Sequence, residues 1–208
     1  MRLLQFTYSP FAAKLRTILK LKNLACELVD VPYLDRSELV KLTGALYVPV
    51  LQDGETVISD SARIVQYLEK KGGPTMYGDP LASVLEQWAD EYFEEVAFKL
   101  ACPGLEERMG RDQGLEAKAL FRLIKERRYG SGIIAQWKRD ETQYREQTLT
   151  LLQPIVDTLK KRPWLVGDSV SVADAAVAGQ LTMVEFAFPE FVAKHAPSLS
   201  AWYAKLKV

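Results

Sequence analysis

The first residues of this chain that could do chemistry are two hydroxyls after a short apolar segment. Leu3 to Thr7 predicts a β-strand, and Tyr8-Ser9-Pro10 ends it. Because proline favours the first position of a helix, Ser9 lies at a predicted helix N-terminus. The helix dipole, free backbone N–H groups and a hydroxyl donor would stabilise a thiolate there. Ser9 is therefore a candidate donor; alternatively, Ser9 only caps the helix.

A second polar pair stands at the start of a later predicted helix. Asp60-Ser61 precedes Ile64, Val65 and Leu68, which recur at helical spacing. The hydroxyl and N–H of Ser61 at a helix start can bind a carboxylate, and the Asp60 carboxylate can receive an ammonium group. The alternative is that these residues form an ordinary helix N-cap.

The composition excludes several other classes of function. The 208 residues include 27 Lys and Arg against 27 Asp and Glu, which argues against nucleic acid or a membrane surface as partner. With one histidine, His195, and with Cys26 and Cys102 far apart, there is no zinc spacing, so we expect no metal. The lack of a signal-peptide core, a disulfide framework and a bilayer-length apolar run predicts a cytoplasmic protein.

The segments around the polar residues predict an α/β unit over residues 1–77. Asp53-Gly54 between two apolar runs is a strong hairpin signal, and Gly72-Gly73-Pro74 ends the last helix. The order β-α-β-α-β-β-α predicts a small mixed sheet covered by helices. Its expected elements are strands near 3–7, 26–31, 48–51 and 56–58 and helices near 11–20, 37–42 and 61–71.

The rest of the chain, residues 78–208, has helical periodicity in every long segment. Asp79-Pro80 predicts the start of the first of these helices. Val172 to Phe186 is apolar on most sides and predicts a buried helix. We therefore expect an all-helical second domain, joined to the first by a short linker near Gly73 to Pro80.

Four motifs occur in order along the chain: Ser9-Pro10-Phe11, Val48-Pro49, Asp60-Ser61 and a helix capping box at Ser171-Val172-Ala173-Asp174. In this order and spacing they resemble the cytosolic glutathione transferase family. The resemblance implies a thioredoxin-like first domain, an all-α helical-bundle second domain and a serine-type active site. Redox-active thioredoxin-like proteins place Cys-x-x-Cys where this chain has Ser9 and Ala12, so disulfide chemistry is not expected.

The resemblance also implies glutathione as cosubstrate. Ser9, or else Tyr8, would hold its sulfur as thiolate, Val48 before a cis Pro49 would pair with its cysteinyl backbone, and Asp60-Ser61 would hold its γ-glutamyl end. The alternative for Pro49 is an edge-strand proline.

The chain departs from the family next to Val48-Pro49. The family often has a basic residue directly before this pair, which helps to hold the glycine carboxylate of glutathione. Tyr47 stands there instead and can donate one hydrogen bond but no charge. Arg36 and Lys41 are the candidates to supply the charge.

The implied activity is conjugation of the glutathione thiolate to a small electrophilic, largely apolar substrate, as in detoxification, by a homodimer. Phe11, Trp88 and Tyr92 are the candidates for the acceptor pocket, although the spacing of such aromatic residues equally suits a core or a subunit interface. The alternatives are a non-catalytic protein of this fold that binds partners, and a glutathione-dependent isomerase or peroxidase.

The remaining reactive or charged residues have structural interpretations. The basic cluster of Arg122, Lys125, Arg127 and Arg128 is interrupted by Glu126 and is interpreted as a solvated helix face. The two cysteines, Cys26 and Cys102, are expected to fill apolar space, the common fate of free cysteine.

Overall fold

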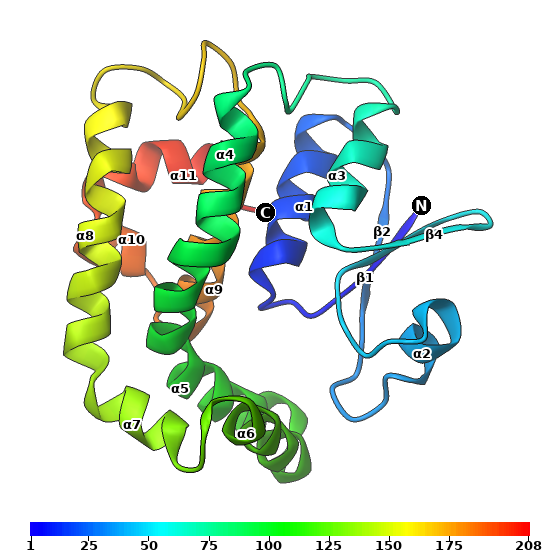
Figure 1. The fold of residues 1–208 in the computed structure, drawn as a ribbon, viewed down its shortest axis with the longest axis vertical. Helices are drawn as coiled ribbons and strands as arrows, with labels where there is room; N and C mark the ends of the chain where they lie inside the picture. The colour runs from blue at the N-terminus through cyan, green and yellow to red at the C-terminus, as the bar shows by residue number, and fades with distance from the viewer.

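A computed structural model describes residues 1–208, and its first part is the predicted α/β unit (Figure 1). The four-stranded sheet has the order β2-β1-β3-β4, in which β2 is parallel to β1 and the other pairs are antiparallel. The thioredoxin-like order β-α-β-α-β-β-α is confirmed. Its elements are β1 (Arg2–Gln5), α1 (Pro10–Leu21), β2 (Glu27–Asp30), α2 (Ser37–Thr43), β3 (Val50–Asp53), β4 (Thr56–Ser59) and α3 (Ser61–Glu69).

Alternating residues of the central strands belong to two different cores. Leu3 of β1 and Leu51 of β3 pack in one buried cluster with apolar residues of α1 and α3. Their neighbours Leu4 and Val50 belong to a second cluster, which also contains Leu39 of α2 and most of the helical core. Since successive side chains of a strand point to opposite faces, the alternation places helices on both faces of the sheet.

The second part of the chain is helical throughout, as predicted (Figure 1). None of its helices combines the length and apolar character that crossing a lipid bilayer requires. The elements are α4 (Leu81–Trp88), a π-helical turn (Ala89–Phe93), α5 (Glu94–Gln113), α6 (Leu115–Tyr129), α7 (Ile133–Arg139), α8 (Glu141–Leu159), α9 (Val172–Ala187), α10 (Phe191–His195), a 3₁₀ turn (Pro197–Leu199) and α11 (Ser200–Leu206).

The predicted boundaries differ from the structure by small amounts. Helix α4 begins at Leu81, one residue later than Asp79-Pro80 predicts, because the Asp79 carboxylate accepts a hydrogen bond from the N–H of Leu81 at 2.8 Å. Helix α3 ends at Glu69, two residues early. The domain boundary at residue 77 stays a prediction, and it falls in the connection between these two helices.

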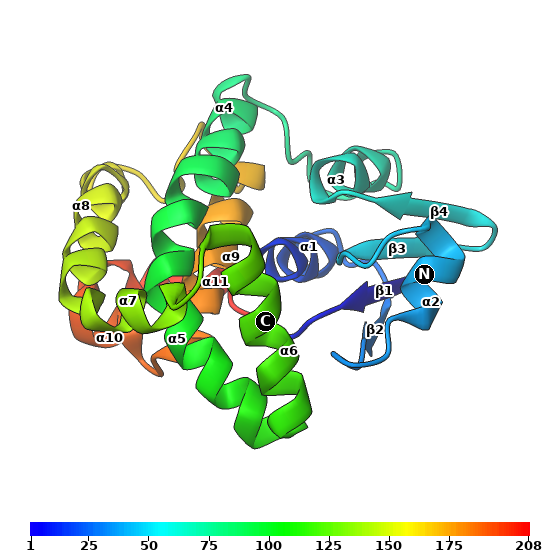
Figure 2. The same cartoon turned by 60° about the horizontal axis from the view of Figure 1, so that its bottom comes forward.

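Helix α1 lies between the sheet and α9, and the two helices approach closely at Gly179 (Figure 2). A Cβ atom on Gly179 would lie 2.5 Å from the carbonyl oxygen of Pro10 and 3.1 Å from the backbone nitrogen of Lys14. Because backbone atoms of α1 fill that space, only a glycine fits between the helices. The first turn of α1, which follows Ser9, is thereby fixed against the helical part of the molecule.

A buried ion cluster ties the same helix to α4. Lys14 of α1 is wholly buried, and its ammonium lies 2.8 Å from Glu86 and 2.5 Å from Asp90. The Tyr77 hydroxyl donates to the other oxygen of Glu86 at 2.8 Å. Burial raises the pKa of Asp90, and the ammonium of Lys14 opposes this shift. A buried cation is tolerated here because two carboxylates compensate it.

The fourth motif caps the buried helix α9 as predicted. Asp174 replaces the usual Glu or Gln, and its carboxylate accepts from the N–H and hydroxyl of Ser171, both at 3.0 Å. The same carboxylate accepts from the backbone N–H of Leu165 at 3.1 Å and from the indole N–H of Trp202 at 2.9 Å. Asp174 therefore joins the loop before α9, the start of α9 and α11.

We expect Gly179→Ala to lower the free energy of unfolding by about 1–3 kcal/mol, because the added Cβ must push α1 and α9 apart. The matched control is Gly110→Ala in α5, where the added Cβ would meet only the flexible side chain of Lys118. Since alanine favours a helix over glycine by about 1 kcal/mol, the control should be as stable as the parent or more stable. Urea unfolding measures both, and equal effects would contradict the close-approach argument.

We expect Asp174→Asn to lower the free energy of unfolding by about 3 kcal/mol, because the amide turns an N–H₂ group toward buried donors and removes the charge. Asp168→Asn is the control, since Asp168 is exposed. Thermal unfolding followed by circular dichroism compares the two variants. A small effect at Asp174 would show that its hydrogen bonds contribute little.

Candidate active site

Ser9 lies at the turn between β1 and α1, where the sequence predicts it. Its backbone N–H donates to the carbonyl of Phe6 at 2.9 Å, and its own carbonyl accepts the first helical hydrogen bond, from Ala13, at 2.9 Å. The Ser9 hydroxyl oxygen accepts from the N–H of Ala12 at 3.3 Å, so it caps α1. No protein group accepts the hydroxyl hydrogen, so the capping serine can still donate to a ligand.

Arg16, in the second turn of α1, binds the segment that precedes Ser9. Its guanidinium donates to the side-chain oxygen of Gln5 at 2.6 Å and to the carbonyl of Thr7 at 3.3 Å. Since Arg16 is buried, these hydrogen bonds are shielded from water. The end of β1 and the start of α1 are thus fixed relative to each other, and with them the Ser9 hydroxyl.

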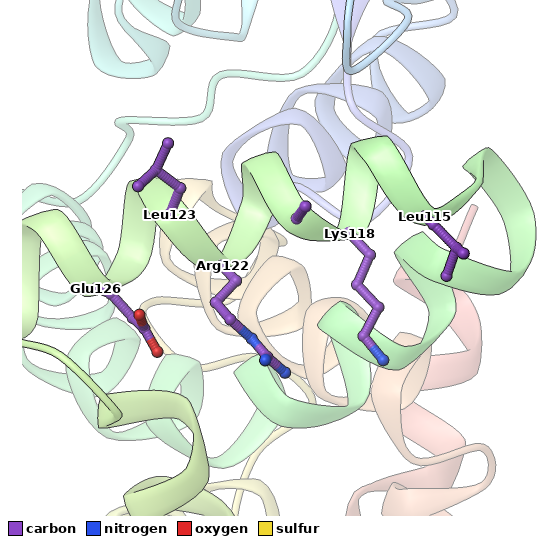
Figure 3. A pocket seen from close by; sticks show the side chains of 6 residues that line it. Leu115, Lys118, Arg122, Leu123 and Glu126 are labelled. Atoms are coloured by element: carbon purple, nitrogen blue, oxygen red, sulfur yellow. The ribbon is translucent and has the colours of Figure 1, made fainter.

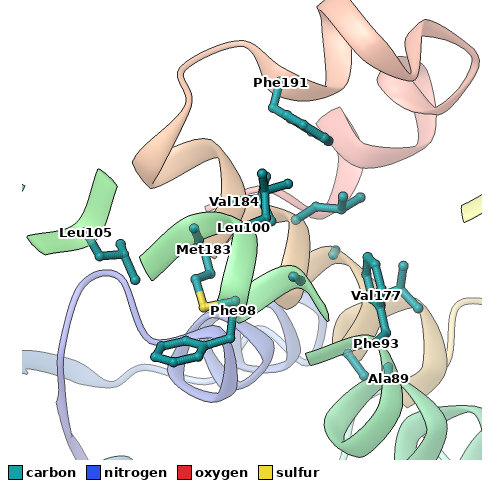
Figure 4. Packing of buried hydrophobic residues seen from close by; sticks show 14 of the residues in the cluster. Ala89, Phe93, Phe98, Leu100, Leu105, Val177, Met183, Val184 and Phe191 are labelled. Carbon is teal, nitrogen blue, oxygen red and sulfur yellow. The ribbon is translucent and has the colours of Figure 1, made fainter. Parts of the chain in front are cut away.

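A pocket of about 170 Å³ opens beside Ser9 between the two parts of the chain. Its first wall comes from the turn after β1, from the start of α1 and from the segments on either side of α2, and its second wall comes from α5, α6 and α9. Phe98 and Met183, which lie side by side in Figure 4, belong to the second wall. The lining residues are Phe6, Tyr8, Ser9, Pro10, Phe11, Tyr33, Arg36, Leu46, Tyr47, Val48, Glu94, Phe98, Ile124, Lys125 and Met183.

Tyr8, the second candidate donor, lines the same pocket inside an aromatic cluster. Its ring stacks on Phe6 with centroids 5.5 Å apart and contacts Phe121 and Phe186 at 6.4 and 5.9 Å. Burial, and after it the neighbouring hydroxyl of Tyr33, raises the pKa of Tyr8 above its usual value. The phenol is therefore a protonated hydroxyl near neutral pH. Which of the two hydroxyls meets the glutathione sulfur stays a prediction.

The segment before β3 presents backbone groups to the pocket. The Val48–Pro49 peptide bond is cis, as the resemblance implies. Neither the N–H nor the C=O of Val48 hydrogen-bonds to another backbone group, although the residue is half-buried in the pocket wall. Tyr47 lines the pocket mouth with 79% of its surface exposed. An extended peptide ligand could pair with Val48 as one strand pairs with another.

Arg36 lies in the pocket wall. It is one of the two candidates to supply the positive charge that is absent at Tyr47. Its guanidinium donates to the carbonyls of Tyr33 at 3.2 Å and Leu46 at 3.3 Å and lies over the rings of Phe6 and Tyr33. The remaining terminal nitrogen is buried and has no hydrogen-bond partner. Lys41, the other candidate, is exposed on α2 and does not line the pocket.

Asp60 and Ser61 lie at the start of α3, outside the residues that line the pocket. The exposed Asp60 has a left-handed backbone with φ of 81°, and its carboxylate accepts from the N–H of Arg63 at 3.0 Å. Asp60 is thus an N-cap, as the structural alternative predicts. The buried Ser61 has an N–H and a hydroxyl with no hydrogen-bond partner in the protein, which leaves them free to bind a carboxylate.

The second wall differs from the acceptor pocket that the sequence predicts. Phe11 lines the pocket, but Trp88 and Tyr92 do not. Trp88 stacks on the core residue Phe93 with centroids 5.5 Å apart, and 67% of the surface of Tyr92 is exposed. Helical periodicity places these side chains on one helix but does not reveal which neighbours cover them.

The sequence pattern also did not predict that charged residues line this wall. Lys125, which charge pattern assigns to a solvated helix face, is half-buried and lines the pocket together with Glu94. Nothing in the local sequence distinguishes Lys125 from its basic neighbours. Its place depends on the packing of α6 beside α5.

The other hollows and reactive groups hold no comparable arrangement. A shallow hollow of about 370 Å³ follows α6 outside the pocket (Figure 3). Its Arg122 is paired with Glu106 at 2.5 Å. No three His, Cys, Asp or Glu residues lie together as metal ligands. The thiols of Cys26 and Cys102 are free, and burial raises the pKa of Cys102 to about 12, so that thiol is protonated and unreactive.

Comparison with known proteins agrees with the fold. The family model of the glutathione S-transferase N-terminal domain matches residues 3–75, and that of the C-terminal domain matches residues 115–207. The chain belongs to the glutathione S-transferase family. The Ser9 turn, the cis Pro49 and the Asp60-Ser61 pair all lie within the N-terminal match of this glutathione S-transferase chain.

Individual glutathione S-transferases are similar to this chain in sequence or in structure. A zeta-class glutathione S-transferase of Euphorbia esula is 40% identical over 75 residues, which are 34% of this chain and 33% of that protein. Glutathione S-transferase U17 of Arabidopsis thaliana is 26% identical over 205 residues, 93% of this chain and 80% of that protein. The crystal structure of a glutathione S-transferase from Rhodospirillum rubrum F11 is 26% identical, with a TM-score of 0.71, and the match covers 98% of this chain and 86% of that one.

Proposed function

We propose that this protein binds glutathione and conjugates its thiolate to a small electrophile. The observation that carries the proposal is the Ser9 hydroxyl, which accepts from Ala12 at the N-terminus of α1 and keeps its own hydrogen free beside a pocket. A glutathione sulfur that receives this hydrogen bond would also face the positive end of the helix dipole. Both interactions favour the thiolate over the thiol.

The other free polar groups suit the remaining parts of glutathione. The unpaired N–H and C=O of Val48 would pair with the backbone of the cysteinyl residue. The N–H and hydroxyl of Ser61 would bind the γ-glutamyl carboxylate, with Asp60 near its ammonium. The unpartnered guanidinium nitrogen of Arg36 would bind the glycine carboxylate, so it replaces the basic residue that is absent at Tyr47.

The chemical task is to generate a thiolate and bring it to the electrophile. A free thiol has a pKa of about 8.5, so most of it is protonated at neutral pH. Lowering that pKa makes the sulfur a nucleophile, which forms a carbon–sulfur bond while the leaving group departs with its electron pair. Because both substrates share one pocket, their collision becomes an intramolecular event.

Two further parts of this proposal concern assembly and the acceptor. A homodimer is proposed, and the exposed apolar residues Leu81, Val84 and Tyr92 along α4 and the π-helical turn support it. The acceptor is proposed to have an apolar body, since Phe11, Phe98, Ile124 and Met183 line the pocket.

We expect Ser9→Ala to lower kcat/KM for glutathione and 1-chloro-2,4-dinitrobenzene by about 100-fold, the usual cost of removing a donor to a developing or bound anion. The pKa of bound glutathione, followed by thiolate absorbance, should rise in the same variant. Tyr8→Phe is the comparison and should retain most of the activity. The reverse order would assign the sulfur contact to Tyr8, and no glutathione binding by the parent protein would refute the proposal.

We expect Arg36→Met to weaken glutathione binding about 10- to 100-fold, because a charge-assisted hydrogen bond to a carboxylate is lost. Calorimetric titration with glutathione and with its glycine ethyl ester tests the assignment. The ester should bind the parent protein more weakly than glutathione does. It should bind the Arg36→Met variant as tightly as glutathione binds that variant. Lys41→Met is the control and should change neither affinity; equal losses for both ligands in Arg36→Met would exclude a contact with the glycine carboxylate.

A further inference from the structure

The helical wall of the pocket contains a cation without a protein partner. The ammonium of Lys125, on α6, lies 4.7 Å from the ring centre of Phe98 and 5.2 Å from that of Phe121. It makes no hydrogen bond or ion pair, and burial lowers its pKa. Aromatic faces attract a cation but replace only part of its hydration. A half-buried ammonium is therefore available to a ligand that brings a negative charge.

The charges around the pocket leave a positive excess. Arg36 and Lys125 line it from opposite walls, Glu94 is the one carboxylate in the lining, and no ion pair joins any of the three. Burial raises the pKa of Glu94, while Arg128 and Lys125 oppose the shift. One carboxylate can compensate one cation at most. Since burying an uncompensated charge is costly, the excess indicates an anionic ligand.

The uncharged pocket residues on the same wall as Lys125 are apolar. These residues are Phe98, Ile124 and Met183, and Phe11 at the start of α1 lines the same pocket. Figure 4 shows the side chains of Phe98 and Met183 next to each other. A ligand that fits this wall has a flat or aliphatic body and one anionic group at its end.

We propose that the electrophile conjugated by this protein carries a carboxylate, which Lys125 binds while the apolar body of the molecule lies against Phe98, Ile124 and Met183. This inference rests on the proposed function, since it names the class of acceptor for the same pocket. Arg36 serves the glycine carboxylate of glutathione on the opposite wall, so Lys125 is the cation left for the second substrate.

A matched pair of aryl chlorides tests this specificity. The thiolate of glutathione attacks the chlorine-bearing carbon of 4-chloro-3-nitrobenzoate, the carbon–sulfur bond forms, and chloride leaves with the electron pair of the broken carbon–chlorine bond. The thiol proton has already passed to solvent. The neutral compound 4-chloro-3-nitrobenzamide undergoes the same substitution and has nearly the same shape, so only the charge differs.

We expect Lys125→Met to lower kcat/KM for the benzoate about tenfold or more, because a charged hydrogen bond is lost, and to leave the value for the benzamide nearly unchanged. Lys125→Arg should restore most of the benzoate activity. Arg127→Met removes a charge from the exposed side of the same helix and is the control. It should leave kcat/KM unchanged for both substrates. Circular dichroism establishes that each variant is folded.

Two kinetic results would overturn the inference. Equal losses for both compounds in Lys125→Met would show that Lys125 acts on the thiolate or on the fold, and unchanged values for both would show that it binds no substrate. If the parent protein conjugates neither compound, calorimetric titration of the benzoate without glutathione decides separately. If Lys125→Met then binds the benzoate about tenfold more weakly, the anion site at Lys125 is supported although the proposed conjugation has failed. If the variant binds the benzoate as tightly as the parent does, both the anion site and the proposed acceptor class are refuted.

Discussion

The close approach of α1 and α9 at Gly179 is the constraint on which the site depends. With no Cβ between the helices, backbone atoms of the first turn of α1 lie directly against α9. That turn begins at Ser9, and α9 also supplies Met183 to the opposite wall of the pocket. The distance between the Ser9 turn and the helical wall is therefore set by helix packing. Interiors are close-packed, so this distance has little freedom to vary.

Two kinds of buried charge have different roles in this fold. Lys14 is wholly buried but lies between Glu86 and Asp90, so it joins α1 to the first helix of the second domain. Arg36 and Lys125 line the pocket without carboxylate partners. Since an uncompensated buried charge lowers stability, we propose that each of these two cations binds a ligand. Partner geometry therefore separates the paired Lys14 from the two unpaired cations, although composition treats all three alike.

Much of the fold could be predicted because its determinants are local. The Asp53-Gly54 turn, the proline after Ser9 and the capping box at Ser171 and Asp174 each act within a few residues. The predicted acceptor pocket was wrong for Trp88 and Tyr92, because the same helical spacing suits a core stack and an exposed face. Lys125 was missed because nothing in its neighbourhood along the chain marks it as different from Arg127.

By itself, the sequence determined the order of strands and helices, the hydroxyl at the start of α1 and the family to which the motifs point. The order of elements and the place of the hydroxyl follow from periodicity, turns and caps, which depend on residues close together in the chain. The family follows from the resemblance of the four motifs. The tertiary structure alone decided which side chains share the pocket and which charges lack partners. Lys14 forms an ion pair with a carboxylate 72 residues away, and Lys125 forms none. Such pairings depend on how distant helices pack, which no local pattern encodes.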